Sequence, residues 1–131
     1  MIFTKSGINN IIITALLAIT LVSCYEQKRV CADFKTGKFE FSQEINGKKQ
    51  TTIFERTDKL QIETYKGKTD TASVRWVNEC EFVLEKLHPK NMQEKKAIGI
   101  RMLSTNENSY TFEFSYLNDA NKQIGKAARI E

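Results

Sequence analysis

The stretch YTFEFSY, residues 110–116, alternates aromatic and polar side chains without interruption. Successive side chains of a β-strand point to opposite faces, so the four aromatic residues of this stretch would share one face. An aromatic face of this size is expected to be buried against a hydrophobic core, whereas the threonine, glutamate and serine between the rings are expected to face solvent. The stretch therefore predicts a half-buried strand of an antiparallel sheet.

The same period of two recurs on both sides of this strand. Alternating or β-branched stretches occupy residues 38–42, 50–56, 60–65, 97–103 and 122–131, and turn-forming residues separate them. One of these turns contains Asn46-Gly47, the dipeptide most typical of a tight hairpin. We expect one apolar face per strand, formed by Leu60, Ile62 and Thr64 in one case and by Ile124, Ala128 and Ile130, with a bulge at Gly125, in another.

Residues 71–87 fit two patterns. With a period of two they form a hairpin that places Trp76, Phe82 and Leu84 on one face, and with a period near four they form a helix with an apolar stripe. Valine, tryptophan and phenylalanine favour the hairpin, as does the alternation in the rest of the chain. Pro89 then requires a loop over residues 88–92, because it cannot donate to a strand ladder.

These stretches predict an all-β fold of about eight short strands in an antiparallel meander. Such a sheet either closes into a barrel, which would resemble the lipocalin-like folds, or divides into a two-layer sandwich. The connections favour the barrel, since closure removes the sheet edges. The predicted core or ligand-lining residues are aromatic: Phe39, Phe41, Trp76, Phe82, Tyr110, Phe112, Phe114 and Tyr116.

The N-terminus has the features of an export leader. An apolar run at residues 11–19 follows Lys5 and is short for a bilayer span. It leads to Leu21-Val22-Ser23-Cys24, which resembles the signal of bacterial lipoproteins at each position. That resemblance implies a signal helix at residues 1–23, cleavage before Cys24, and diacylglycerol and palmitate or a similar acyl group on that residue. An ordinary secretory signal and an uncleaved anchor are the alternatives.

On this interpretation residues 24–36 form a tether and residues 37–131 a β domain in the cell envelope, anchored to a membrane by lipid. In an oxidising compartment the two remaining cysteines, Cys31 and Cys80, favour a disulfide. Two buried free thiols are the alternative. A metal site is a weaker interpretation, because His88 would be only a third soft ligand.

The sequence contains no catalytic motif that we recognise. The formal net charge is +4, but acidic and basic residues are interspersed, which does not predict a nucleic-acid surface. Strand glutamates, among them Glu55, Glu63 and Glu113, alternate with apolar residues and are expected on the wet face. We therefore predict a non-enzymatic protein without a cofactor.

The pattern of Trp76, Cys80, Phe82 and Leu84 resembles small uncharacterised envelope lipoproteins of bacteria. Some of these carry a DNA topoisomerase IV name, which does not suit a chain this short with an export leader. Two functions are consistent with the sequence. The leading one is an interaction or structural module that docks another envelope protein or a wall polymer, and the alternative is a small hydrophobic-ligand-binding barrel of lipocalin type. An interior cavity would favour the alternative.

Overall fold

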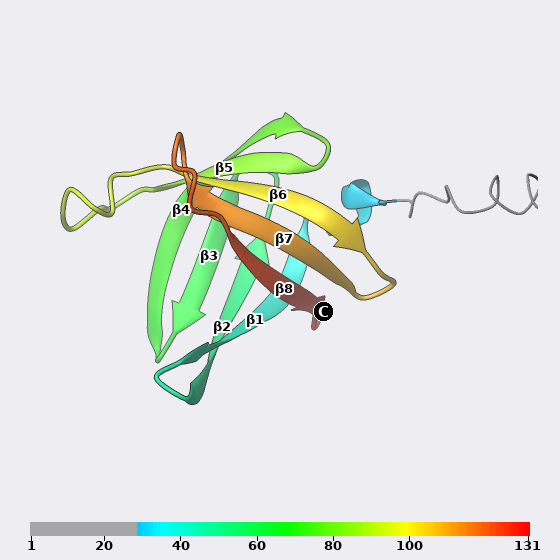
Figure 1. The fold of residues 1–131 in the computed structure, drawn as a ribbon, viewed down its shortest axis with the longest axis horizontal. Helices are drawn as coiled ribbons and strands as arrows, with labels where there is room; N and C mark the ends of the chain where they lie inside the picture. The colour runs from blue at the N-terminus through cyan, green and yellow to red at the C-terminus, as the bar shows by residue number, and fades with distance from the viewer. Residues whose placement is uncertain (1–28) are drawn as a thin grey trace, which may run out of the picture.

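The computed structural model describes residues 29–131, which form a closed eight-stranded antiparallel barrel (Figure 1). The strands follow one another around the barrel in chain order, and the last pairs with the first. They are β1 (Gly37–Ile45), β2 (Lys48–Arg56), β3 (Leu60–Tyr65), β4 (Lys68–Asn78), β5 (Glu81–Lys86), β6 (Ile98–Thr105), β7 (Ser109–Tyr116) and β8 (Gln123–Arg129). The prediction of an all-β meander is confirmed, and of its two forms the barrel is the one observed.

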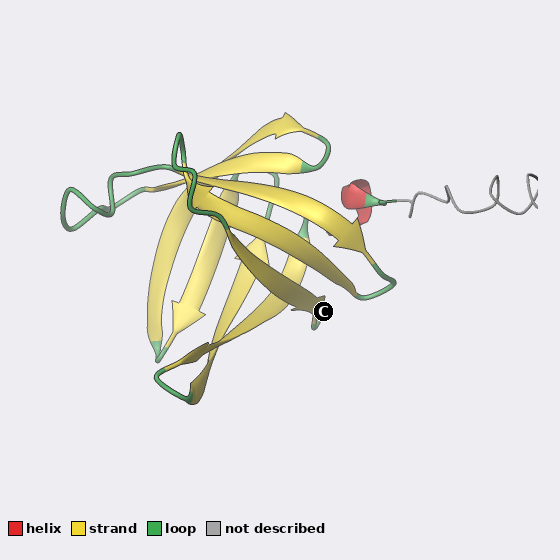
Figure 2. Ribbon diagram, in the orientation of Figure 1, coloured by secondary structure: helices red, strands yellow, loops and turns green. Residues whose placement is uncertain are grey.

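Among residues 29–131, helical structure is confined to one short 3-10 turn, η1 (Cys31–Phe34), as Figure 2 shows. None of the helices in the described part of the chain is long and apolar enough to cross a membrane. The predicted signal helix and lipidation site at Cys24 lie outside the described residues.

Tight turns set the register of the first strand pairs. Asn46 and Gly47 both have positive φ, as a two-residue hairpin turn of this handedness requires, and Ile45 pairs with Lys48 across it. Lys66 and Gly67 repeat the arrangement between β3 and β4, where Tyr65 pairs with Lys68. The predicted hairpin at Asn46-Gly47 is therefore confirmed.

Residues 71–87 form the hairpin of β4 and β5, not a helix. Trp76 and Phe82 are cross-strand partners whose ring centroids are 4.6 Å apart. The ladder is irregular between Trp76 and Asn78, where the strand turns towards Cys80. The β-branched and aromatic residues thus determined the structure of the segment that the sequence left ambiguous.

The turn η1 covers one end of the barrel, which we call the closed end. Cys31 and Phe34 are buried, and Cys31 forms a disulfide with Cys80 in the turn between β4 and β5. The predicted disulfide is confirmed. Part of the segment that we assigned to the tether is therefore packed into the barrel core.

The last strand brings small residues to the closure of the barrel. Gly125 pairs with Phe112 in an unbroken register, so the predicted bulge is absent there. A Cβ atom at this position would lie 2.6 Å from the Phe41 ring, which explains why a glycine is needed. Ala127 is the buried residue of β8, whereas Ile124 is 61% exposed, so the predicted apolar face of this strand was wrong.

The inward face of β3 also differs from the prediction. Gln61 is only 3% exposed and Glu63 lines the interior, whereas Leu60 lies on the outside. The turn at Lys66 and Gly67 is the reason, because it pairs Gln61 with the buried Ala72 and so fixes the face. The interior of the barrel therefore contains polar groups that the alternation pattern had assigned to solvent.

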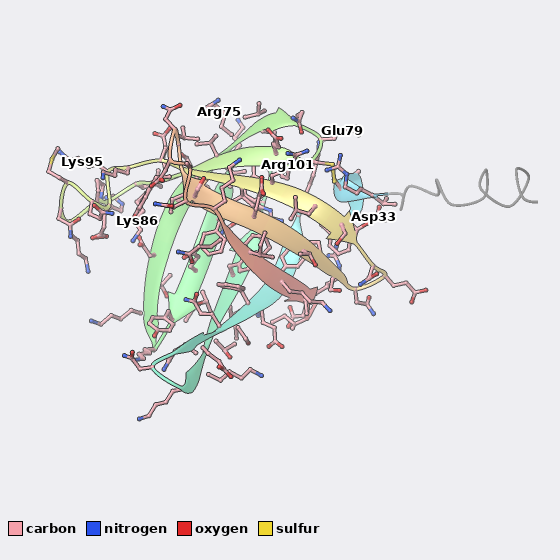
Figure 3. The ribbon with its side chains drawn as sticks, viewed as in Figure 1. Asp33, Arg75, Glu79, Lys86, Lys95 and Arg101 are labelled. Carbon is pink, nitrogen blue, oxygen red and sulfur yellow. A yellow bond between two sulfur atoms is a disulfide. The ribbon has the colours of Figure 1, made fainter. Side chains whose placement is uncertain are left out.

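The outer surface carries charges of both signs on strands and loops (Figure 3). Arg101 pairs with Glu81 at 3.4 Å and Lys122 with Glu113 at 3.5 Å, both on the outside of the barrel. Exposed pairs of this kind contribute little stability, about 0 to 1 kcal/mol each. The surface agrees with the mixed-charge pattern of the sequence.

Candidate ligand-binding cavity

The interior of the barrel contains a cavity of about 230 Å³. Its walls come from six strands, β1, β2, β3, β5, β6 and β7, and are mainly apolar. Aromatic and aliphatic residues form most of the lining: Phe41, Phe54, Leu84, Ile98, Ile100, Tyr110, Phe112 and Phe114. Polar groups, Arg56, Gln61 and Glu63 among them, lie along one side. An apolar space with a few convergent polar groups is the usual composition of a small-molecule site.

A second cavity of about 170 Å³ adjoins the first at the opposite end from η1. Glu63, Leu84 and Ile98 line both spaces, so the two are neighbours. We call this end of the barrel the mouth. It opens to a wider hollow of about 700 Å³ that is lined by charged residues, among them Lys68 and Lys90. The interior can therefore be reached from solvent at the mouth.

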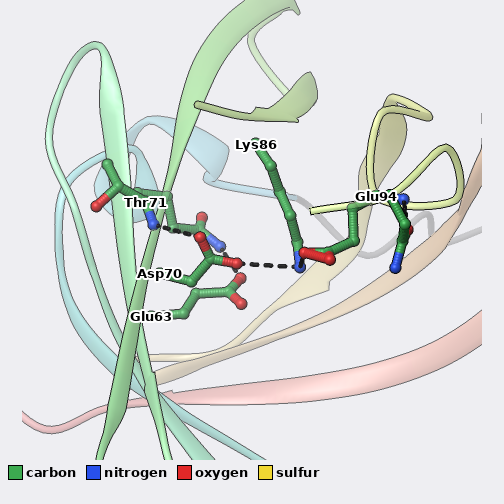
Figure 4. A network of polar contacts seen from close by, with 7 residues as sticks. Glu63, Asp70, Thr71, Lys86 and Glu94 are labelled. Carbon is green, nitrogen blue, oxygen red and sulfur yellow. Dashed lines mark hydrogen bonds and ion pairs between the residues drawn. The ribbon is translucent and has the colours of Figure 1, made fainter. Parts of the chain in front are cut away.

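A polar network lies at the mouth (Figure 4). The Lys86 Nζ atom lies 3.0 Å from an oxygen of Asp70 and 3.1 Å from one of Glu94. The backbone N–H of Thr71 donates a further hydrogen bond to Asp70, at 2.9 Å. The network joins β4, the end of β5 and the loop between β5 and β6.

The same contacts change the pKa values of the pair. The hydrogen bond from Lys86 is the main cause that lowers the pKa of Asp70, against a smaller opposite effect of burial. Burial lowers the pKa of Lys86, but its hydrogen bonds with Asp70 and Glu94 outweigh this effect and leave the pKa raised. Both groups are thus held in their charged forms at neutral pH.

The loop of residues 87–97 forms one rim of the mouth. Gln93 donates a 2.8 Å hydrogen bond from its side-chain amide to the hydroxyl of Tyr116 on β7, and Glu94 contacts Lys86. In Figure 1 this loop extends from the barrel on the side away from η1. It is attached to the mouth by side chains at two points.

At the inner end of the cavity, Arg56 connects the barrel wall to η1. Its guanidinium donates to the carbonyl oxygens of Phe34 and Lys35, to the Gln61 side-chain oxygen and to the Tyr110 hydroxyl, at 2.6 to 3.2 Å. Arg56 is 2% exposed. Burial raises the pKa of the Tyr110 hydroxyl, although the nearby Arg56 opposes that effect.

The predicted aromatic residues divide between the two ends of the barrel. Phe39, Trp76 and Phe82 pack with η1 at the closed end. Phe41, Tyr110, Phe112 and Phe114 line the inner cavity, and Tyr116 lies at the mouth. His88 is an exposed residue beside the outer hollow. In the part of the chain from residue 29 onwards, no group of three or more histidine, cysteine or acidic side chains is placed to hold a metal ion.

Sequence reasoning missed the polar residues of the cavity, Arg56, Gln61 and Glu63. For Arg56 a signal existed, because it shares the period of two with Thr52 and Phe54 and so belongs to the inner face of β2. For Gln61 and Glu63 the only signal was the register imposed by the turn at Lys66-Gly67. The alternation rule places the polar residues of a strand on the face exposed to solvent, and this rule does not hold for a barrel whose internal cavity is partly polar.

The chain matches no known family model, and it shows no significant similarity to any curated protein or solved structure.

Proposed function

We propose that this chain is a lipid-anchored protein of the cell envelope that binds a small, largely apolar molecule inside its barrel, without catalysing a reaction. The interior cavity supports the binding role most strongly. Its volume of about 230 Å³ is below the range of roughly 300 to 1,000 Å³ of typical ligand pockets, so the occupant would be small. The adjoining space towards the mouth provides the path by which it would enter.

The lipid anchor follows from the resemblance of Leu21-Val22-Ser23-Cys24 to a lipoprotein signal. Cys24 precedes Arg29 by five residues, which can span at most about 18 Å. Arg29 donates a hydrogen bond to the carbonyl of Met102, and the chain then enters η1 at the closed end. An anchored barrel would therefore turn its closed end towards the membrane and its mouth towards the aqueous compartment.

Binding is tested by titrating the purified protein with 1-octanol and following the fluorescence of Trp76, the single tryptophan. The decisive variant is Ile98→Phe, because Ile98 lines both cavities and a phenyl ring would occupy part of their volume. The matched control is Ile53→Phe, the same substitution at an outward position that is 38% exposed. Urea unfolding of both variants checks that they fold.

We expect saturable 1:1 binding to the wild type and to Ile53→Phe, and at least a ten-fold loss of affinity in Ile98→Phe. Equal binding by the two variants would place the alcohol outside the barrel, and an absence of binding to the wild type would contradict the ligand-binding role. The anchor is tested separately: Cys24→Ser should move the protein from the membrane fraction to the soluble fraction. Retention of that variant in the membrane would contradict acylation of Cys24.

The interaction module remains a second candidate, and a feature of the outer wall favours it. A surface hollow of about 440 Å³ lies over β4 to β7, and the exposed side chains of Val77 (57%) and Leu117 (46%) border it. Apolar side chains grouped on one exposed face are typical of docking surfaces. Crosslinking in intact envelopes should then yield one stoichiometric partner that Val77→Lys abolishes and Ile53→Lys does not. Identical crosslinks from both variants would contradict docking at this face.

A further inference from the structure

We propose that the ligand of the barrel carries a carboxylate, and that Arg56 binds this group at the inner end of the cavity. The inference rests on the proposed ligand-binding function and specifies the chemical class of the ligand: a short amphipathic anion such as a medium-chain fatty acid, with its head inside and its tail towards the mouth. The evidence is the charge, the partners and the position of Arg56.

Arg56 is a buried cation whose charge is not paired. Among residues 29–131 no carboxylate forms an ion pair with it, and all four of its hydrogen bonds go to neutral oxygens. Buried charges are normally paired, because removing them from water is unfavourable. An anion in the cavity would supply the missing partner.

Aromatic rings surround the guanidinium and replace part of its hydration. The Cζ atom of Arg56 lies 4.6 Å from the ring centroid of Phe82 and 5.2 Å from that of Phe39, and the rings of Phe54, Tyr110 and Trp76 lie within 6.0 Å. Contacts between a cation and ring faces stabilise the buried charge but do not neutralise it. The inner end of the cavity therefore has a positive potential within apolar walls.

The hydrogen bonds of Arg56 leave one donor available. A guanidinium has five N–H donors, and four have acceptors in the described part of the chain: one on Nε, one on Nη1 and two on Nη2. The second N–H of Nη1 has none there. Nη1 is also the nitrogen that bonds Gln61, and both residues line the cavity. A carboxylate that accepts this hydrogen bond would gain from its charge-assisted character.

Glu63 is an acidic residue of the cavity lining, and its charge works against an anion. The Gln61 side chain accepts from Arg56 through its oxygen and donates to Glu63 through its nitrogen, at 2.9 Å, so one amide separates the cation from the carboxylate. This arrangement separates the Glu63 carboxylate from Arg56. It also allows the site to be tested without a substitution of Arg56.

The experiment compares octanoate, 1-octanol and octylammonium, which have the same chain and different heads, by Trp76 fluorescence and by calorimetry at neutral pH. We expect octanoate to bind the wild type at least ten-fold more tightly than 1-octanol, and octylammonium to bind most weakly. Binding of 1-octanol with no preference for octanoate would overturn the carboxylate site and leave the proposed function standing. A preference for octylammonium would also overturn it, because the acidic residues would then dominate. Binding of none of the three would overturn both proposals.

The decisive variants exchange the two polar residues of β3 that line the cavity. Gln61→Glu combined with Glu63→Gln conserves the net charge but places a carboxylate directly on Arg56, and Glu63→Gln alone is the matched control. The double variant should lose the ten-fold preference for octanoate while still binding 1-octanol. The single variant should bind octanoate at least as tightly as the wild type does. A double variant that folds, binds 1-octanol and retains the preference would show that Arg56 is not the anchor.

Discussion

Replacing Cys31 and Cys80 together by alanine should lower the free energy of unfolding by about 4 kcal/mol. The disulfide joins residues separated by 49 positions. A loop of that size removes about 14 cal/mol/K of chain entropy from the unfolded state, which corresponds to about 4 kcal/mol at room temperature. Single domains have a total stability of only about 5 to 15 kcal/mol, so the loss would be a large part of it.

The folded barrel should nevertheless keep its closed end. Phe34 packs against the rings of Phe39 and Tyr110, and Arg56 donates to the carbonyl groups of Phe34 and Lys35; none of these contacts involves the disulfide. The native structures of the variant and of the wild type should therefore be alike, and 1-octanol should bind both equally. The stability difference then arises mainly in the unfolded state.

The assay is urea unfolding followed by Trp76 fluorescence, on the double variant and on the wild type with and without a reductant. Cys24→Ala is used as the background throughout, so that no third thiol can exchange with the disulfide. We expect the reduced wild type and the variant to agree, and both to be less stable than the oxidised protein. A loss below about 1 kcal/mol would refute the loop-closure reasoning.

Three further substitutions test separate features of the barrel by their urea midpoints. Gly125→Ala should destabilise it by about 1 to 3 kcal/mol, because the new methyl group would lie 2.6 Å from the Phe41 ring and 2.8 Å from the Phe112 ring; no loss would mean that both rings are free to move. Lys66→Asn should stabilise it by up to about 1 kcal/mol, because Lys66 has a φ of 49° that asparagine tolerates better, and a loss would contradict this. The pKa of Asp70 is lowered in the folded protein. The ionised Asp70 therefore contributes to the free energy of unfolding at a pH above its usual pKa of 3.8, and this contribution is lost as the pH falls through its pKa in the folded state. Because Asp70 and Lys86 are both more than a third exposed, that contribution should stay below about 1 kcal/mol. Asp70→Asn should then lose less stability than the wild type between about pH 5.5 and about pH 3, and equal losses would contradict the pairing.

Local patterns were sufficient to predict most of the fold. The aromatic alternation of residues 110–116, the Asn46-Gly47 turn and the β-branched residues of 71–87 each depend on neighbours in sequence, and each gave the element that is observed. The disulfide joins residues that are 49 positions apart, and it was predicted from the number of cysteines that remain after Cys24, not from a local pattern. The sequence favoured a closed barrel over a two-layer sandwich but did not decide between them. Closure depends on the pairing of β1 with β8, which are far apart in the chain, and no local pattern predicts such a pairing.

The candidate site was harder to predict, for two physical reasons. Alternation identifies the inside of a sheet only where the inside is apolar, and on β3 the polar Gln61 and Glu63 face a cavity while Leu60 faces out. The role of Gly125 depends on a ring from β1, which packs on it only after the barrel has closed. Arg56 alternates with Phe54 in the sequence, but its neutral partners come from η1, β3 and β7.

The most direct test of the central claim, that a small molecule binds inside the barrel, is the position of the bound probe by NMR. The protein is labelled at its isoleucine and leucine methyl groups, and intermolecular NOEs to 1-octanol are recorded. We predict NOEs to Leu84, Ile98 and Ile100, which line the cavity. NOEs confined to outward methyl groups such as those of Ile53 and Ile124 would show that the alcohol binds the outer surface and would contradict a ligand site in the interior.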